Sequence, residues 1–108
     1  QLTKAGGYDH NWVLNTKGDE KAVAATVYSP VSGILMEVYT NEPGLQIYCG
    51  NMMKEETGKK GATYPRRGAI CLESQHYPDS PNHPDFPSTI LEPGQKYYSR
   101  CIYKFLVK

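Results

Sequence analysis

The fold class is decided by the stretch Ala22-Val-Ala-Ala-Thr-Val-Tyr-Ser-Pro-Val-Ser-Gly-Ile-Leu-Met-Glu-Val-Tyr-Thr-Asn41. Two runs rich in apolar and β-branched residues, 22–28 and 34–41, are separated by a short segment that contains Pro and Gly. In the second run Ile34, Met36 and Val38 fall on one face, because successive side chains of a strand point to opposite faces. The stretch therefore predicts a β-hairpin.

Further strands are predicted on both sides of turn signals along the rest of the chain. Alternating or apolar runs occupy residues 45–51, 69–75 and 96–107, and residues 54–61 form a charged, Gly-bearing loop. Glu42-Pro-Gly44 has Pro and Gly where a type II turn needs them, and Glu92-Pro-Gly-Gln95 is a second turn. No apolar set recurs with helical spacing, and no regular strand is expected before residue 22. The predicted class is all-β, an antiparallel sandwich or barrel.

Size and charge exclude several classes of function. The chain has 108 residues, with 12 basic and 11 acidic side chains and a net charge of +1. This length allows one small domain. A protein that binds nucleic acid through bulk electrostatics would carry a clear basic excess, so no nucleic-acid partner is expected. No apolar run approaches the roughly 20 residues of a membrane span, and no membrane partner is expected.

The cysteines and histidines predict neither a disulfide framework nor a metal site. Cys49, Cys71 and Cys101 are odd in number and lack a C-x-x-C pair, so we expect small, buried, apolar side chains. The histidines form neither an H-x-H nor an H-E-x-x-H ligand set. They are His10, His76 and His83.

Four prolines recur at every third position in the stretch Tyr77-Pro-Asp-Ser-Pro-Asn-His-Pro-Asp-Phe-Pro-Ser88. Three residues per turn is the period of polyproline II, which would align the prolines along one edge. A ligand for an aromatic groove is one interpretation. A stiff, extended loop between two strands is the interpretation that we favour.

Three polar residues are candidates for a functional site. In the run 69–75, alternation puts Glu73 on a face with small and polar neighbours, where partial enclosure would raise its pKa toward the range of a general base. Gln46 points away from the side of its apolar neighbours. Asp9 lies in Gly6-Gly-Tyr-Asp-His-Asn-Trp-Val-Leu14, in which polar groups and aromatic rings could hold a sugar. The alternatives are a solvent-facing carboxylate at Glu73 and local backbone capping at Asp9 and Asn11.

Five motifs together resemble one family, in family order and over nearly the whole chain. The sequence is similar to the C-terminal part of the aldose 1-epimerases, the galactose mutarotase family. The motifs are Gly7-Tyr-Asp-His-Asn-Trp-Val-Leu14, Met36-Glu-Val-Tyr-Thr-Asn-Glu-Pro-Gly-Leu-Gln-Ile-Tyr-Cys-Gly-Asn51, Gly68-Ala-Ile-Cys-Leu-Glu-Ser-Gln75, His83-Pro-Asp-Phe-Pro-Ser88 and Leu91-Glu-Pro-Gly-Gln95.

This resemblance implies a large antiparallel β-sandwich and a reaction on free aldohexoses such as galactose and glucose. The family interconverts their α and β anomers without cofactor or metal. Glu73 matches the family's general base, while Asp9 and Gln46 match residues that hold sugar hydroxyls. The family's acid is a histidine in its N-terminal part, and none of the three histidines of this chain matches that motif.

The resemblance also implies that residues 1–108 are the C-terminal segment of a longer single-domain enzyme. We expect the segment alone to be inactive and to self-associate through exposed sheet edges. The alternatives are a non-catalytic carbohydrate-binding or accessory domain, a structural interaction piece built on the proline-rich loop, and a hexose-6-phosphate 1-epimerase that uses Arg66 and Arg67. For those arginines and for Lys59-Lys60, a solvated loop is the interpretation that we favour. A cytoplasmic location is expected, with periplasmic and secreted locations left open.

Overall fold

The computed structural model describes residues 2–108 and is built almost entirely from short antiparallel strands. No helix in this range has the length and apolar character needed to cross a bilayer. In chain order the elements are α1 (Leu2–Ala5), β1 (Asp9–Val13), β2 (Ala25–Tyr28), β3 (Ile34–Thr40), β4 (Gly44–Tyr48), β5 (Glu56–Thr57), the 3-10 turn Lys59–Gly61, β6 (Thr63–Tyr64), β7 (Cys71–Gln75), the 3-10 turn Ser80–Asn82 and β8 (Cys101–Val107).

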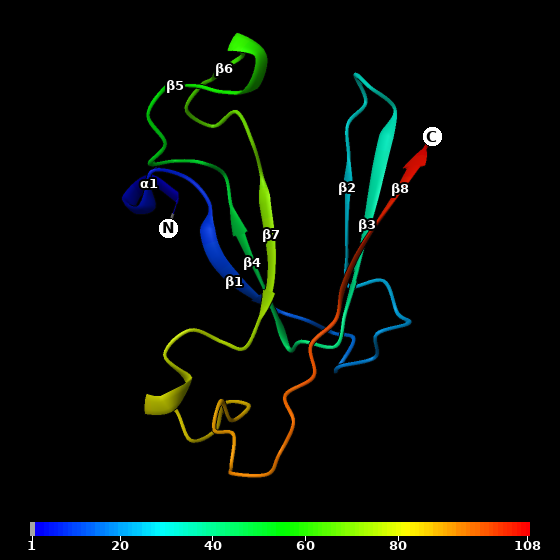
Figure 1. Ribbon diagram of the computed structural model, residues 1–108, viewed down its shortest axis with the longest axis vertical. Helices are drawn as coiled ribbons and strands as arrows, with labels where there is room; N and C mark the ends of the chain where they lie inside the picture. Colours follow the sequence, from blue (N-terminus) through cyan, green and yellow to red (C-terminus); the bar gives the residue numbers. More distant parts are fainter. Residues whose placement is uncertain (1) are drawn as a thin grey trace.

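The strands form two three-stranded sheets that meet at one end and diverge at the other (Figure 1). One sheet has the order β1-β4-β7 and the other the order β2-β3-β8, and every pairing is antiparallel. The sheets meet where β3 leads into β4, and the pair β5-β6 forms a separate small hairpin. The predicted antiparallel all-β class is therefore confirmed.

The predicted hairpin forms between β2 and β3, with Ala25 opposite Val38 and Tyr28 opposite Leu35. Its turn is closed by hydrogen bonds from Ser29 N to Ile34 O and from Gly33 N to Ser29 O. Gly33 has φ +72°, a left-handed conformation that glycine adopts at little cost. The runs predicted at 45–51, 69–75 and 96–107 each contain a shorter strand, because turns take up their ends.

Two local predictions about strands and turns are wrong. β1 lies in the segment where no strand was expected, and it pairs with β4 along its whole length. Gly44 does not have the positive φ that a type II turn at Glu42-Pro-Gly44 requires, and it is the first residue of β4. Gly94 has φ +87°, and Gln95 N donates to Glu92 O, so the second predicted turn does form.

The expectations for the prolines and cysteines are also wrong. The proline-rich stretch is a series of tight turns, with hydrogen bonds from Asn82 N to Asp79 O, from His83 N to Ser80 O and from Phe86 N to His83 O. These turns replace the extended path that a period of three would give. None of the three cysteines is buried, and Cys101 is exposed.

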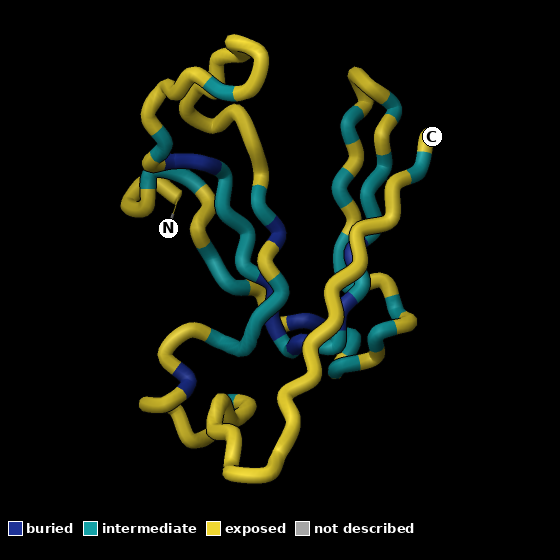
Figure 2. Tube along the Cα trace, in the orientation of Figure 1, coloured by how far each residue is buried: buried dark blue, intermediate teal, exposed yellow. Residues whose placement is uncertain are grey.

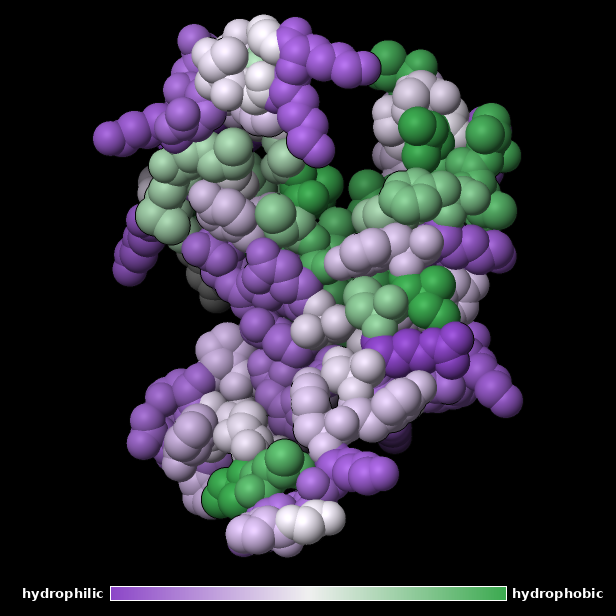
Figure 3. Space-filling model, in the orientation of Figure 1, coloured by the Kyte–Doolittle hydropathy of each residue, from purple (hydrophilic) through white to green (hydrophobic). Residues whose placement is uncertain are grey.

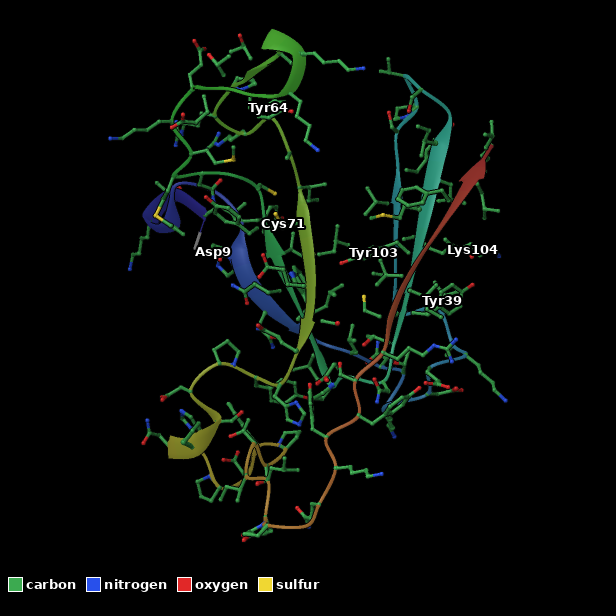
Figure 4. All side chains as sticks on the ribbon, in the orientation of Figure 1. Asp9, Tyr39, Tyr64, Cys71, Tyr103 and Lys104 are labelled. Carbon is green, nitrogen blue, oxygen red and sulfur yellow. The ribbon has the colours of Figure 1, made fainter. Side chains whose placement is uncertain are left out.

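A small core lies where the two sheets meet, as Figure 2 shows. Leu14, Val38, Leu45 and Leu72 are its buried apolar residues, and partly buried side chains of β2 and β3 pack against them. Tyr103 reaches from β8 toward β7 (Figure 4), and its hydroxyl donates to Leu72 O. This bond joins the edge strands of the two sheets.

Away from this junction the apolar faces are open. The radius of gyration is 16.4 Å, whereas a compact chain of this length has about 13 Å. Apolar side chains gather over the β2-β3-β8 arm (Figure 3), and Phe105 and Val107 are 65% and 88% exposed. Much of the apolar surface of this chain is thus not covered by its own packing.

A long segment without strands, residues 76–100, hangs from the closed end of the sheets (Figure 1). Both of its ends are attached to the residues that link β3 and β4. Asn41 donates to Tyr98 O and accepts from Arg100 N. Glu42 contacts His76 at the start of the segment and Tyr97 near its end. The link between the two sheets therefore also anchors this segment.

Candidate sugar site on the polar face of the β1-β4-β7 sheet

One face of the β1-β4-β7 sheet is polar. The ladder places Asn11 opposite Gln46, and Gln46 opposite Glu73, so one row crosses all three strands. Alternation along each strand adds the neighbours two residues away to the same face. The apolar residues Leu45 and Leu72 point to the other face and are buried. The polar side chains of this face are Asp9, Asn11, Gln46, Tyr48, Glu73 and Gln75.

The three residues that the sequence singled out line one hollow on this face. Asp9 lies at the start of β1 (Figure 4), Gln46 in β4 and Glu73 in β7. The hollow has a volume of about 500 Å³. Its remaining lining residues are Tyr48, Met52, Gln75 and Pro78. Residues that lie 37 and 64 positions apart along the chain are thus brought together by the strand order.

A chain of side-chain hydrogen bonds runs across the face. Gln46 Nε2 donates to Asp9 Oδ1 at 2.8 Å. Gln75 Nε2 donates to Gln46 Oε1 at 3.3 Å and to Asn11 Oδ1 at 3.2 Å. The local capping expected as an alternative for Asp9 and Asn11 is therefore not what their side chains do. They accept hydrogen bonds from other strands.

Glu73 is the free carboxylate of this face. Its side chain is exposed and lines the hollow, and no side chain among residues 2–108 donates a hydrogen bond to it. The enclosure that the sequence analysis considered for Glu73 is absent in this chain. An exposed carboxylate without a partner is chemically available to a proton on a ligand in the hollow.

Gly44 makes room for the network. A β-carbon built at this position would lie 2.6 Å from Asn11 Oδ1, 3.0 Å from Tyr77 Cδ1 and 3.1 Å from Gln75 O. Any other residue would displace Asn11 or the end of β7. Gly44 is therefore required by close approach rather than by an unusual backbone conformation.

Comparisons with known proteins identify the family of the chain. The sequence model of the aldose 1-epimerase family matches residues 1–104.

The chain belongs to the aldose 1-epimerase family.

Among its relatives, galactose mutarotase of Mus musculus is 44% identical over 102 residues, a match that covers 94% of this chain and 30% of the mouse protein. Aldose 1-epimerase of Escherichia coli (strain K12) is 40% identical over 107 residues, covering 97% and 31%. The crystal structure of an aldose epimerase homologue from C. elegans superposes with a TM-score of 0.81 at 27% identity, covering 93% and 30%. The chain thus spans about 30% of the length of the relatives that it matches.

A second acidic side chain, Glu42, is buried and is contacted within the chain. Glu42 is 2% exposed; Tyr97 donates to its Oε1, and its Oε2 lies 2.7 Å from His76 Nδ1. Burial raises the pKa of Glu42, but hydrogen bonds from Ser99 and Tyr97 and the charge of His76 outweigh it, so the pKa lies below the ordinary value of 4.5. This carboxylate holds the structure together at the base of the sheets.

The remaining polar candidates lie outside the hollow. Lys59 and Lys60 are exposed, as expected for a solvated loop. Arg66 Nε donates to Asn51 O at 2.6 Å, and Arg67 donates to Gly6 O, so this pair fixes the loop to the segments that precede β1 and follow β4. Both arginines line a different hollow from the one at Glu73. Among residues 2–108 no group of three or more potential ligands is arranged to hold a metal ion.

Gln75, Asn11 and Tyr48 belong to the face although the sequence analysis did not select them. Gln75 could have been predicted from the sequence, because alternation along the strand puts it on the same face as Glu73. Asn11 could have been found only with β1 identified as a strand. Tyr48 accepts a hydrogen bond from Met52 N at 3.2 Å, a contact that no spacing indicates.

Proposed function

We propose that this chain supplies the base and part of the sugar-binding surface of an enzyme that interconverts the α and β anomers of free aldohexoses such as galactose and glucose. The observation that carries the proposal is the convergence of Asp9, Gln46 and Glu73 on one hollow in a member of the aldose 1-epimerase family. Relatives named galactose mutarotase support the choice of substrate class.

In the proposed reaction, Glu73 takes the proton of the anomeric hydroxyl. The electrons of that O–H bond form the C1=O1 double bond, the C1–O5 bond breaks, and O5 takes a proton from an acid. Rotation about C1–C2 and the reverse steps then give either anomer. Asp9 accepts from ring hydroxyls and Gln46 donates to them, so the sugar is held with O1 toward Glu73.

The chain provides one half of this acid–base pair. His76 is bound to Glu42, and His83 lies 3.3 Å from Asp79, so neither lines the hollow. His10 Nδ1 accepts from Asp9 N, and the ring lies on the opposite face of β1. We propose that residues 1–108 form the C-terminal segment of a longer β-sandwich enzyme whose remaining part supplies the acid. The open apolar faces support this proposal.

Polarimetry on freshly dissolved α-D-galactose tests the proposal, with the 108-residue chain and with a protein that also contains the upstream part found in its relatives. The longer protein should accelerate the optical drift, and Glu73→Gln in it should abolish the acceleration while galactose binding is retained. Glu56→Gln, on the exposed β5, is the matched control. Full turnover by Glu73→Gln would refute the assignment of the base. Turnover by the short chain alone would refute the proposed division of the pair.

The alternatives fare less well on the structure. A non-catalytic carbohydrate-binding domain needs acceptors for hydroxyls but no base, whereas Glu73 matches the position of the general base in the family that the sequence resembles. A sugar phosphate would need cations at the hollow, whereas Arg66 and Arg67 line another one. The proline-rich stretch forms compact turns and offers no extended ligand.

Self-association of the isolated 108-residue chain stays a prediction. β8 is an edge strand, and six of its seven residues are exposed, so its outer backbone groups are open to pairing. Sedimentation equilibrium should show a dimer or larger species at micromolar concentrations. A stable monomer throughout that range would contradict the prediction.

A further inference from the structure

The direction of the hydrogen bonds on the polar face is set by Asp9. A carboxylate only accepts hydrogen bonds, so Gln46 must turn its Nε2 toward Asp9 Oδ1, 2.8 Å away. The oxygen Oε1 of the same amide then lies on the opposite side, toward β7. A donor on β7 is in reach of it.

Gln75 is that donor, and it has a second acceptor. Its Nε2 lies 3.3 Å from Gln46 Oε1 and 3.2 Å from Asn11 Oδ1. The amide nitrogen carries two hydrogens, which are enough for both contacts. With its oxygen held by Gln75, Asn11 keeps its Nδ2 group free. Likewise Gln46 keeps one of its two N–H groups free.

We infer that Gln75 is a positioning residue that fixes the orientation of the Gln46 and Asn11 amides for sugar recognition. Asp9 fixes the orientation of the Gln46 amide on β4, and the Gln46 oxygen in turn accepts from Gln75 on β7. Gln75 then donates to Asn11 on β1. The face then presents N–H donors at Gln46 and Asn11, with carboxylate acceptors at Asp9 and Glu73. Sugar hydroxyls both donate and accept, so this alternation suits neighbouring hydroxyls of one ring. The identity of the ligand in this inference rests on the proposed function.

A purely structural role for Gln75 explains less. The residue opposite it in the ladder, Gly44, has no side chain, so Gln75 supports no cross-strand packing there. Its side-chain nitrogen instead contacts two residues of the polar face. Gly44 in turn leaves the space that Asn11 needs to reach Gln75.

The test uses the longer protein, which also contains the upstream part found in its relatives, with Gln75→Met, a substitution that keeps length and volume but removes the donor. Two readouts are measured by NMR: contacts between the Gln46 side-chain amide protons and the Asp9 β-protons, and the galactose affinity. Loss of one hydrogen bond to a binding group should weaken affinity about twofold to tenfold. The Gln46–Asp9 contacts should weaken as well, because the amide can then turn over. Gln95→Met, in the exposed turn at Glu92–Gln95, is the control and should change neither.

A double-mutant cycle separates positioning from a general structural effect. In a Gln46→Met background, Gln75→Met should cost clearly less affinity than in the parent chain. Equal costs in both backgrounds, or unchanged Gln46–Asp9 contacts, would overturn the inference. If Gln75→Met is unfolded by circular dichroism, Gln75→Glu replaces it; this variant faces two oxygens with an acceptor and should disturb the Gln46 amide at least as much.

The same data distinguish this inference from the proposed function. If galactose shifts no resonance of the longer parent protein while Gln75→Met still releases the Gln46 amide, positioning stands and the sugar assignment fails. If galactose binds and the Gln46–Asp9 contacts are unchanged in Gln75→Met, the sugar assignment stands and the inference fails.

Discussion

Two glutamates of this chain lie in surroundings of opposite character. Glu42, between the two sheets, is 2% exposed and is contacted by Tyr97 and His76. Glu73, on the polar face of the β1-β4-β7 sheet, is exposed and lines a hollow. A buried carboxylate is stable only with partners around it, and Tyr97 and His76 are those partners for Glu42. An exposed carboxylate carries no desolvation penalty, and it remains free to contact a ligand. The chain thus holds one of these acids by internal contacts and leaves the other accessible to a ligand.

The separation extends to the regions around them. Near Glu42, polar contacts join segments that have no strand pairing, as when Asn41 holds Tyr98 and Arg100. Around Glu73 the strand pairing already fixes the backbone. The side-chain hydrogen bonds there orient the amide groups and are not needed to hold the strands together. Substitutions near Glu42 should therefore change stability, and substitutions near Glu73 should change binding and turnover.

The largest expected effect is that of Glu42→Leu. The substitution keeps the volume but removes the buried acceptor of Tyr97, which is 64% exposed, and of the partly exposed His76. Hydrogen bonds to a charged group contribute about 1.5–3 kcal/mol each, so the loss of two should cost about 3 kcal/mol of unfolding free energy. Urea unfolding of the 108-residue chain measures this cost. Glu55→Leu, in an exposed loop, should stay within about 0.5 kcal/mol. Similar losses in the two variants would remove the distinction between the regions.

Gly44→Ala should come next, because it forces a β-carbon between Asn11, Tyr77 and the backbone of Gln75. Overpacking of this kind typically costs about 1–3 kcal/mol. Gly61→Ala is the informative contrast: the space there is open but φ is +74°, so only the left-handed backbone is penalised, at about 1 kcal/mol. Thermal unfolding should rank Gly44→Ala as the more damaging. The reverse order would mean that Asn11 and its neighbours move aside to accommodate the added methyl group at little cost in free energy.

The pH dependence of stability should sharpen the same comparison. Because the pKa of Glu42 is lowered in the folded chain, its charge stabilises the fold above about its ordinary value of 4.5. That contribution is lost as the pH falls through the lowered pKa. In Glu42→Gln it is absent, so the stability difference between parent and variant should shrink from pH 6 to pH 3. A difference that stays constant over this range would show that the charge of Glu42 contributes nothing.

Much of the polar face could be predicted from local alternation. Alternation along residues 69–75 puts Glu73 on the face of the strand that points away from the buried Leu72. In the same way, the run from Leu45 directs Gln46 away from the core. The distances that make the site could not be predicted in this way. They depend on β4 lying between β1 and β7, and that order is set by pairings between residues far apart in the chain.

β1 was missed for a physical reason. In Asp9-His-Asn-Trp-Val13 the residues facing the hollow are polar, and those on the other face, His10 and Trp12, are only partly covered. Neither face is apolar enough to give the signal of a half-buried strand. The proline-rich stretch was predicted wrongly because its pattern was strong but did not determine the conformation. Its regular spacing suggested an extended path, but Asp79 adopts a left-handed conformation and starts a turn.

The smallest effect on stability is expected for Glu73→Gln. The side chain is exposed and has no partner among residues 2–108, so the unfolding free energy should change by less than about 0.5 kcal/mol. The polar face should also keep its order, because Asp9, Gln46 and Gln75 are bonded without Glu73. Urea unfolding and the Gln46–Asp9 NMR contacts of the same variant check both points. Marked destabilisation would place Glu73 beside Glu42 as a structural acid, and any loss of turnover would then no longer identify a base. Unchanged stability and retained galactose binding together with abolished turnover is the result that only a chemical role for Glu73 explains.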